Sequence, residues 1–302
     1  TNHNIFDSVR GATKHLNSST NDDQVTTSDT LTGFIEGGFS LGPDAGGFGT
    51  NVETSTSSYV AWCMKAGGAA SSNSNGDLAS SVSTADHGGF SIGTYTGNTT
   101  TSTTKTVGHG LSRVPSWIIV KKTGTGNDQS WTVFQEDIFN AASDEYIILS
   151  QAGAKTNGAS FASTSPNSTV FSAGNDATNE NGSTFVFYAF AKTPGLIASG
   201  SYTGNNSSTN GTSVVVDDGA SGFRPAWLLL KNINDSENWV LFDSARSPSN
   251  PVDGYLSPNT NAVDTSATGL PLDFTANGFK QRNNSNMTNE DTIIYLAFAD
   301  QP

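Results

Sequence analysis

One apolar hairpin pattern occurs twice in the chain, and this repetition constrains the fold more than any other feature. Residues 116–122 read Ser-Trp-Ile-Ile-Val-Lys-Lys and residues 226–232 read Ala-Trp-Leu-Leu-Leu-Lys-Asn, each directly after a proline. A polar turn follows each run and leads into an aromatic run, at 131–134 and 239–242. Two apolar runs around a turn rich in Gly, Asn and Asp predict a β-hairpin. Its duplication predicts a repeat protein.

Further landmarks repeat at nearly the same spacing. The sequence Tyr-Thr-Gly-Asn begins at Tyr95 and again at Tyr202, 107 positions later, and the apolar run 187–191 recurs at 295–299. Units of this length with many short strands predict an all-β fold of tandem antiparallel β-sandwich domains. The continuous apolar runs predict central strands covered on both faces, whereas the alternation at 131–134 predicts one buried and one partly exposed face.

The beginning of the chain matches the second half of such a unit. Residues 5–10 match 241–246, and residues 59–63 match 295–299. We therefore expect the first unit to be incomplete on its N-terminal side, its missing strands being supplied by upstream chain or by a neighbouring subunit. The predicted division is a half unit over 1–66, a linker or weak hairpin over 67–88, a second unit over 89–195 and a third over 196–302.

The composition excludes several classes of partner. The formal net charge is −13, and the 14 Lys and Arg residues are scattered singly or in pairs. Nucleic acids and anionic membrane surfaces are bound by clustered basic residues, so we expect neither as a partner. No apolar stretch approaches the about 18–20 residues of a membrane span, so we expect no membrane insertion. The single cysteine, Cys63, lies in an apolar strand-like run, which predicts a buried thiol.

No catalytic motif stands out, and we expect neither an enzyme nor a cofactor. The four histidines share no spacing typical of metal ligands. The pattern Gly-x-Ser-x-Gly occurs at 38–42 and 89–93, but neither copy supports the strained turn of a nucleophilic site, and a Gly-rich phosphate loop is missing. Calcium stays open as an alternative, because oxygen ligands from turns suit this ion, although the spacing is not that of an EF-hand. The best calcium cluster comprises Asn175, Asp176, Asn179, Glu180 and Asn181.

An Asp-Ser-x-Arg element occurs in the first and third units. It combines Asp7 with Arg10 and Asp243 with Arg246, whereas the second unit has no arginine at this place. An active site rarely needs a copy in each domain. We therefore interpret the element as a structural ion pair that closes a turn.

The Tyr-Thr-Gly-Asn loops carry an aromatic ring beside amide and hydroxyl groups. Sugar-binding surfaces are made of such residues, and so are ordinary β-turns. The candidate ligand-binding residues are Tyr95, Asn98, Tyr202 and Asn205. A structural turn is the alternative interpretation, favoured by the close recurrence of the motif.

Several longer motifs together resemble a known family. They are Phe-Asp-Ser-Val-Arg-Gly-Ala-Thr (6–13), Tyr-Val-Ala-Trp-Cys-Met-Lys-Ala-Gly-Gly (59–68), Gly-His-Gly-Leu (108–111), Gly-Ser-Tyr-Thr-Gly-Asn (200–205) and Gly-Phe-Arg-Pro-Ala-Trp (222–227). The resemblance is to a repeated β-domain family found in tail-fibre and other virion-surface proteins of marine and other bacteriophages. It covers nearly the whole chain. It implies a fibrous, oligomeric protein on the virion surface, which is an extracellular location, and it transfers no catalytic residues.

We therefore expect a non-enzymatic structural protein of a bacteriophage tail fibre or spike that attaches to glycans or envelope proteins of the host surface. Its expected partners are other virion proteins and further copies of itself, with a homotrimer suggested by the analogy with fibres. Three alternatives stay open: a capsid decoration or head-fibre protein that needs no receptor, a polysaccharide-degrading spike, and a cellular adhesin or surface-filament subunit.

Overall fold

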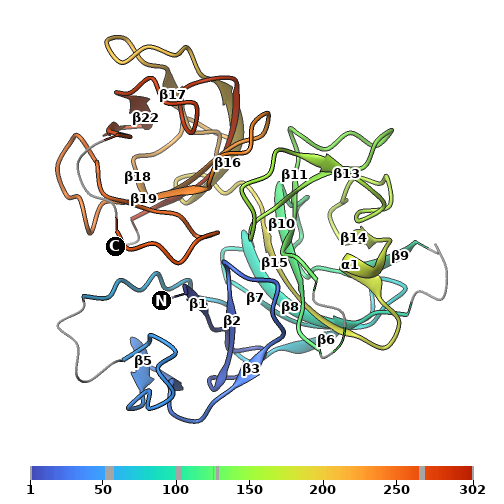
Figure 1. The fold of residues 1–302 in the computed structure, drawn as a ribbon. Helices are drawn as coiled ribbons and strands as arrows, with labels where there is room; N and C mark the ends of the chain where they lie inside the picture. Colours follow the sequence, from blue (N-terminus) through green and yellow to red (C-terminus); the bar gives the residue numbers. More distant parts are fainter. Residues whose placement is uncertain are drawn as a thin grey trace.

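The computed structural model describes residues 2–51, 58–98, 104–124, 126, 129–264 and 269–300. The chain is almost entirely β-structure, and the one helix among the described residues, α1 (Asp176–Asn179), has four residues. The ribbon forms three lobes that meet near the middle of the molecule (Figure 1). We call them the first unit (residues 2–66), the second unit (67–195) and the third unit (196–300). The prediction of an all-β, sandwich-type fold is confirmed.

The second unit is a sandwich of a large and a small sheet. The large sheet has the strand order β13-β12-β11-β10-β15-β8-β7-β6, the small sheet pairs β14 with β9, and neighbouring strands are antiparallel. The large sheet comprises β6 (Ser71–Asn73), β7 (Ser80–Thr84), β8 (Phe90–Thr96), β10 (Trp117–Lys122), β11 (Thr132–Gln135), β12 (Glu145–Ile148), β13 (Thr156–Asn157) and β15 (Thr184–Phe190). The small sheet comprises β9 (Lys105–Gly108) and β14 (Val170–Ala173).

The third unit has the same central strand order. Its large sheet runs β16-β23-β18-β19-β20, which corresponds to β8-β15-β10-β11-β12, and its small sheet runs β17-β22-β21. The large sheet comprises β16 (Ile197–Thr203), β18 (Pro225–Asn232), β19 (Val240–Asp243), β20 (Tyr255–Leu256) and β23 (Thr292–Ala299). The small sheet comprises β17 (Ser213–Val215), β21 (Leu272–Thr275) and β22 (Gly278–Gln281).

The first unit contains only part of this fold. Its strands are β1 (Asn4–Ile5), β2 (Lys14–Asn17) and β3 (Val25–Thr26) in one sheet, and β4 (Leu31–Ile35) and β5 (Gly38–Leu41) in another. The pair Ile5 and Leu16 corresponds to the pair Leu241 and Leu256, so β1 and β2 correspond to β19 and β20. In the same way, β4 and β5 correspond to β21 and β22, because each pair forms a hairpin with opposed phenylalanines.

Residues 67–88 hold a hairpin that extends the second unit. Strand β7 pairs with β8 and with β6, which makes β6 the edge of the eight-stranded sheet. Of the two predicted alternatives, linker or weak hairpin, the structure contains the hairpin. In the third unit, β16 forms the corresponding edge of its sheet and has no such hairpin beside it.

Residues 59–63 differ from their prediction. They form no strand, and Cys63 is exposed, so the expectation of a buried thiol is wrong. The matching strands of the other units, β15 and β23, each lie between two hydrogen-bonded neighbours. The described part of the first unit has no counterpart of those neighbours, and this run belongs to none of the sheets found there.

Both faces of the central strands of each large sheet are buried. In β15, Phe185 and Phe187 face the small sheet of the second unit, whereas Val186 and Tyr188 face a cluster built by all three units. We call this cluster the shared core. It consists of Leu16 of the first unit; Ala85, Phe90, Ile92, Trp117, Trp131, Val133, Ile138, Ile147, Leu149, Val186, Tyr188 and Phe190 of the second; and Ile197, Leu229, Ile233, Trp239, Leu241, Ile294 and Leu296 of the third.

The shared core changes one prediction about exposure. Residues 131–134 were expected to have a partly exposed face, and this is wrong, because all four are buried. Trp131 and Val133 would face solvent in an isolated sandwich, but they pack into the shared core instead. The apolar runs of β10 and β18 are covered on both faces, as expected.

Candidate functional site

The same kind of hydrogen bond, from a tryptophan ring to a backbone oxygen, joins the second unit to the first and the third unit to the second. The ring N–H of Trp131 donates to the backbone oxygen of Asn17 over 2.9 Å, from the second unit to the first. The ring N–H of Trp239 donates to the backbone oxygen of Ile148 over 3.0 Å, from the third unit to the second. Both tryptophans are fully buried. The second and third units are therefore each joined to the preceding unit by a tryptophan ring N–H that donates to a backbone oxygen at an equivalent position.

The first unit closes this arrangement against the third. His3 occupies the position of the two tryptophans and lies near the backbone of Ser257, although its Nε2 has no hydrogen-bond partner. Burial lowers the pKa of this histidine below its ordinary value, against the opposing effect of the Ser257 backbone. The hydroxyl of Ser18 also donates to the backbone oxygen of Pro258 over 2.6 Å. The three junctions thus give the molecule an approximate threefold arrangement.

A buried lysine adds a second repeated contact. Lys121 Nζ donates to the backbone oxygen of Asn21 over 3.0 Å, and Lys231 Nζ donates to that of Ala152 over 3.1 Å. Both lysines are fully buried in the large sheet of their own unit. A buried ammonium is tolerated when its three donors have acceptors, which backbone carbonyls supply here. The two lysines therefore fasten neighbouring units together, and the sequence pattern did not reveal this role.

Lys231 should make stability depend on pH. Burial lowers its pKa to about 8, against the carboxylates of Glu237 and Asp235. An unfolded lysine has a pKa of about 10.4, so the unfolded chain binds more protons between these values. Stability should therefore rise with pH through this window, by up to about 3 kcal/mol at ~1.4 kcal/mol per pH unit.

Urea unfolding at pH 7.5 and pH 10.5 measures this rise. We expect Lys231→Met to remove it, whereas Lys65→Met, which replaces an exposed lysine, should keep it. Buried tyrosines whose pKa is raised lower the stability of every variant above pH 10, so the difference between variants is the relevant quantity. An equal pH response in Lys231→Met and in the unchanged protein would contradict the assignment.

The Asp7–Arg10 element lies where the first unit meets the second. Arg10 Nε is 2.5 Å from Asp7 Oδ2, and both side chains are at most 3% exposed. The hydroxyl of Tyr188, from β15, donates to the same carboxylate over 2.7 Å. The element also caps its own turn, since the backbone N–H of Arg10 donates to Asp7 Oδ1.

The Asp243–Arg246 element lies where the third unit meets the first. Its ion pair has the same 2.5 Å separation, and the ring N–H of Trp62 donates to Asp243 Oδ2 over 3.3 Å. The guanidinium of Arg246 lies 5.8 Å from the centre of the Trp62 ring. Both copies of the element therefore hold units together as well as closing a turn.

The tyrosines of the Tyr-Thr-Gly-Asn loops are buried. Tyr95 is 3% exposed and donates to the backbone oxygen of Thr178, and Tyr202 is 9% exposed and donates to that of Thr288 over 2.5 Å. Their rings therefore offer no surface to a ligand. The glycine of the motif has a structural cause: a Cβ at Gly97 would lie 2.3 Å from a backbone oxygen.

The asparagines of these loops are exposed but engaged. The backbone N–H of Asn98 donates to the side chain of Asn179 over 3.0 Å. In the third unit, the N–H of Asn205 donates to the side chain of Asn289 over 3.3 Å, and the Asn205 side chain bonds to Asn210. These contacts are those of the structural turn, and ligand binding at Asn98 and Asn205 stays a prediction.

Three of the five residues proposed for calcium have other partners, whereas Asp176 and Asn181 are exposed. Asn175 caps α1 by accepting from Ala177, and Asn179 is fully buried. Glu180 forms an ion pair with Lys122 and accepts from Ser183 over 2.7 Å, and these bonds lower its pKa. Across the described residues, no group of three or more His, Cys, Asp or Glu side chains is placed to hold a metal ion.

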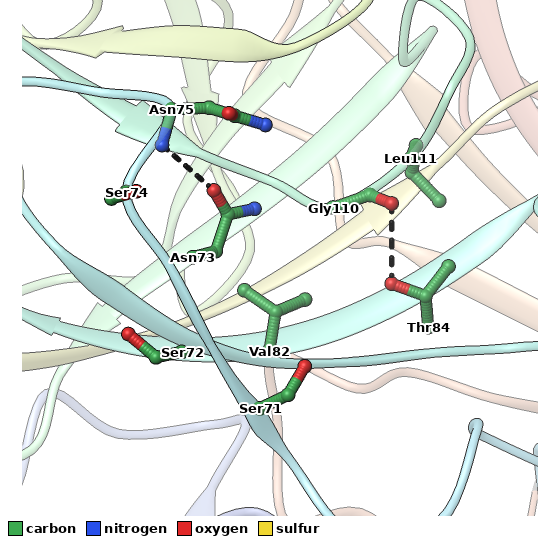
Figure 2. Close-up of a pocket in the computed structure, with 9 residues that line it drawn as sticks. All are labelled: Ser71, Ser72, Asn73, Ser74, Asn75, Val82, Thr84, Gly110 and Leu111. Atoms are coloured by element: carbon green, nitrogen blue, oxygen red, sulfur yellow. Dashed lines mark hydrogen bonds between the residues drawn. The ribbon is translucent and has the colours of Figure 1, made fainter.

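A shallow pocket lies beside the β6–β7 hairpin, and sequence analysis did not single it out. It has a volume of about 350 Å3, and its lining contains no charged side chain (Figure 2). The side chain of Asn73 accepts from the N–H of Asn75 over 2.9 Å, and Thr84 donates to the backbone oxygen of Gly110 over 3.3 Å. The lining residues are Ser71, Ser72, Asn73, Ser74, Asn75, Val82, Thr84, Gly110 and Leu111.

A second pocket lies on the third unit and has a different chemistry. Its volume is about 530 Å3, and charged Asp253 and Arg282 are among the residues that line it. It also includes Ser208, which is exposed.

In the described part of the chain, no helix could span a bilayer.

Comparison with known families places the whole chain in one of them. The family is described as a domain of unknown function, DUF7483, and its match covers residues 1–302. The chain belongs to the DUF7483 family. The searches of curated proteins and of solved structures found no match to the chain.

Proposed function

We propose that this DUF7483 protein is a non-enzymatic structural protein of a bacteriophage tail fibre or spike that attaches the particle to the host surface. The observation that carries the proposal is the three-unit body with its shared core. The recurring polar elements singled out in the sequence serve contacts within this body or between its units. A rigid β scaffold of this kind is a support for binding at its surface loops. The sequence resemblance supplies the virion setting.

Attachment requires a surface that recognises the host, and the pocket of Figure 2 is the best candidate. It lies on the β6–β7 hairpin, at the sheet edge where the third unit has no added strands. Its hydroxyl and amide groups donate and accept hydrogen bonds, as the hydroxyls of a neutral sugar do. The absence of charged side chains among its lining residues favours a neutral saccharide over an acidic one.

An array of bacterial surface polysaccharides and neutral oligosaccharides tests this attachment. We expect the protein to bind neutral members, and Ser72→Trp to weaken binding about tenfold or more by filling the pocket. Ser208→Trp, which places the same bulk in the second pocket, should bind like the unchanged protein. If the protein binds nothing on the array, or both variants bind equally well, this pocket is not the attachment site.

Antibody-gold labelling of intact particles tests the location separately. Label at the tail or its tips supports the attachment role. Label spread over the capsid would overturn it in favour of a decoration or head-fibre protein. Label on cell surfaces and on no particle would identify a cellular adhesin.

A further inference from the structure

The first unit exposes apolar side chains that the third unit buries. Phe34 is 44% exposed, whereas its counterpart Phe274 is 2% exposed, and Tyr59 is 52% exposed against 2% for Tyr295. The large exposed apolar side chains of the first unit's described residues are Phe34, Ile35, Leu41, Tyr59 and Met64. We call these five residues the open face. Large apolar side chains that are exposed in one unit, where the counterparts of Phe34 and Tyr59 are buried in a complete unit, indicate a site that a partner covers.

The third unit shows what covers the equivalent surface. Strand β23, which contains Tyr295, lies between β16 and β18, and β22, which contains Phe279, pairs with β17. The covering elements therefore all lie within residues 197–232, and β8, β9 and β10 do the same in the second unit. The described part of the first unit contains no counterpart of them. The second and third units thus show which strands cover this surface in a complete unit.

Buried polar atoms without partners also concentrate in the first unit. Apart from Glu136 Oε1 and Arg246 Nη1, which are held in ion pairs, twelve buried side-chain nitrogen and oxygen atoms of the described residues lack a hydrogen-bond partner, and nine of them belong to residues 3–50. They include both ring nitrogens of His15, which is 0% exposed between the rings of Phe6 and Phe48. Such atoms cost free energy, so this unit is a fold whose polar groups are only partly satisfied.

The junction between the first and third units is also incomplete. At the other junctions, a hydrogen bond links Lys155 N–H to Ile233 and Gln24 N–H to Thr123. The acceptors follow β18 and β10, so the first unit's described residues have no equivalent acceptor. The matching segment of the third unit is exposed, and its Val263 is 82% exposed. Strands added at the open face would supply this acceptor, and the junction between the first and third units would then match the other two junctions.

We propose that the open face is the acceptor for a partner polypeptide segment with the pattern of β16–β18. Such a segment would add strands on both sides of residues 59–63 and one beside β5, by β-strand addition. Its chemistry follows from the two complete units: a Gly-x-Tyr-Thr-Gly-Asn strand, a short apolar strand, and a Pro-x-Trp strand whose penultimate residue is lysine. The tryptophan would pack on Trp62 as Trp227 packs on Phe298, with ring centres 5.1 Å apart. This inference does not depend on host attachment.

Cys63 provides the readout, because it is exposed and is the chain's single cysteine. Its counterpart in the second unit, Ala191, is 1% exposed. Two donors are tested: a free peptide of residues 197–232, and a fusion in which residues 197–237 precede Asn2. The fusion reproduces the loop of the third unit, where Glu237 is followed by Asn238 and Trp239 and here would be followed by Asn2 and His3.

We expect either donor to slow the reaction of Cys63 with Ellman's reagent about tenfold or more, because pairing on both sides suppresses local opening. The control donors carry Leu228→Asp and Leu230→Asp, which place charges in the sandwich core and should give no protection. Protection of Cys63 by the unchanged donor, free or fused, and not by its control supports the proposal. Unchanged reactivity with both donors, or equal protection by the controls, would overturn it.

Discussion

Replacing Trp239 with alanine is expected to destabilise the protein by about 3–5 kcal/mol, the range for removing a buried tryptophan. Trp239 is fully buried in the shared core, and its ring centre lies 6.1 Å from that of Trp117 in the second unit. The substitution also removes the ring N–H that bonds to Ile148. The backbone oxygen of Ile148 would then lose a partner from the neighbouring unit. Guanidinium unfolding followed by circular dichroism measures the loss.

The matched control is Trp239→Phe, which keeps an aromatic ring and loses the hydrogen bond, so its cost should be about 1–2 kcal/mol. Because the shared core joins the units, the alanine variant should unfold in one transition, shifted as a whole. Two separate transitions, with that of the second unit unchanged, would show that the units are independent domains and would contradict the shared core.

Replacing Arg10 with methionine should cost a similar amount, about 3–5 kcal/mol, because it leaves the buried carboxylate of Asp7 without its cation. Arg246→Met removes the equivalent cation at the other junction. The two carboxylates left behind are similarly buried, at 3% exposed for Asp243 and 1% for Asp7, but the Arg246 side chain is 14% exposed against 3% for Arg10. Water can therefore reach the space left by Arg246 more easily and solvate Asp243, so the cost should be smaller. Urea unfolding of both variants at pH 7 measures the difference.

A double variant separates charge from packing. Combining Arg10→Met with Asp7→Asn removes the unpaired charge, and we expect it to recover part of the loss. If Arg10→Met costs no more than Arg246→Met, or if the double variant recovers nothing, the burial of the ion pair does not determine its contribution.

The repeated hairpin was enough to predict its two strands in each unit and the burial of the first of them. The apolar runs 118–120 and 228–230 indicated central strands, and the structure covers them on both faces. The alternation at 131–134 misled, because a period of two reports a sheet with one solvated face. Here the outer face packs against neighbouring units, and a local pattern carries no information about such contacts.

The candidate site was less accessible to sequence reasoning. Whether a tyrosine beside a polar loop points outwards depends on the strand that contains it, and the alternating burial at the ends of β8 and β16 turns Tyr95 and Tyr202 inwards. The pocket beside β6 combines residues 71–75 with Gly110 and Leu111, which only the fold brings together. A signal was present in Asn75-Gly76-Asp77, the turn of the added hairpin, but it did not indicate a cavity.

The approximate threefold arrangement has a consequence for how the molecule presents itself. Three separate copies would come apart on dilution, since association depends on concentration. In this chain the hydrogen bonds of Trp131 and Trp239 between units are intramolecular, so dilution does not break them. A trimer of identical copies must also repeat every insertion three times. This chain carries the β6–β7 hairpin on its second unit, whereas the matching sheet edge of its third unit has no added strands. The three units therefore present different surfaces, which the three copies of a symmetric trimer do not.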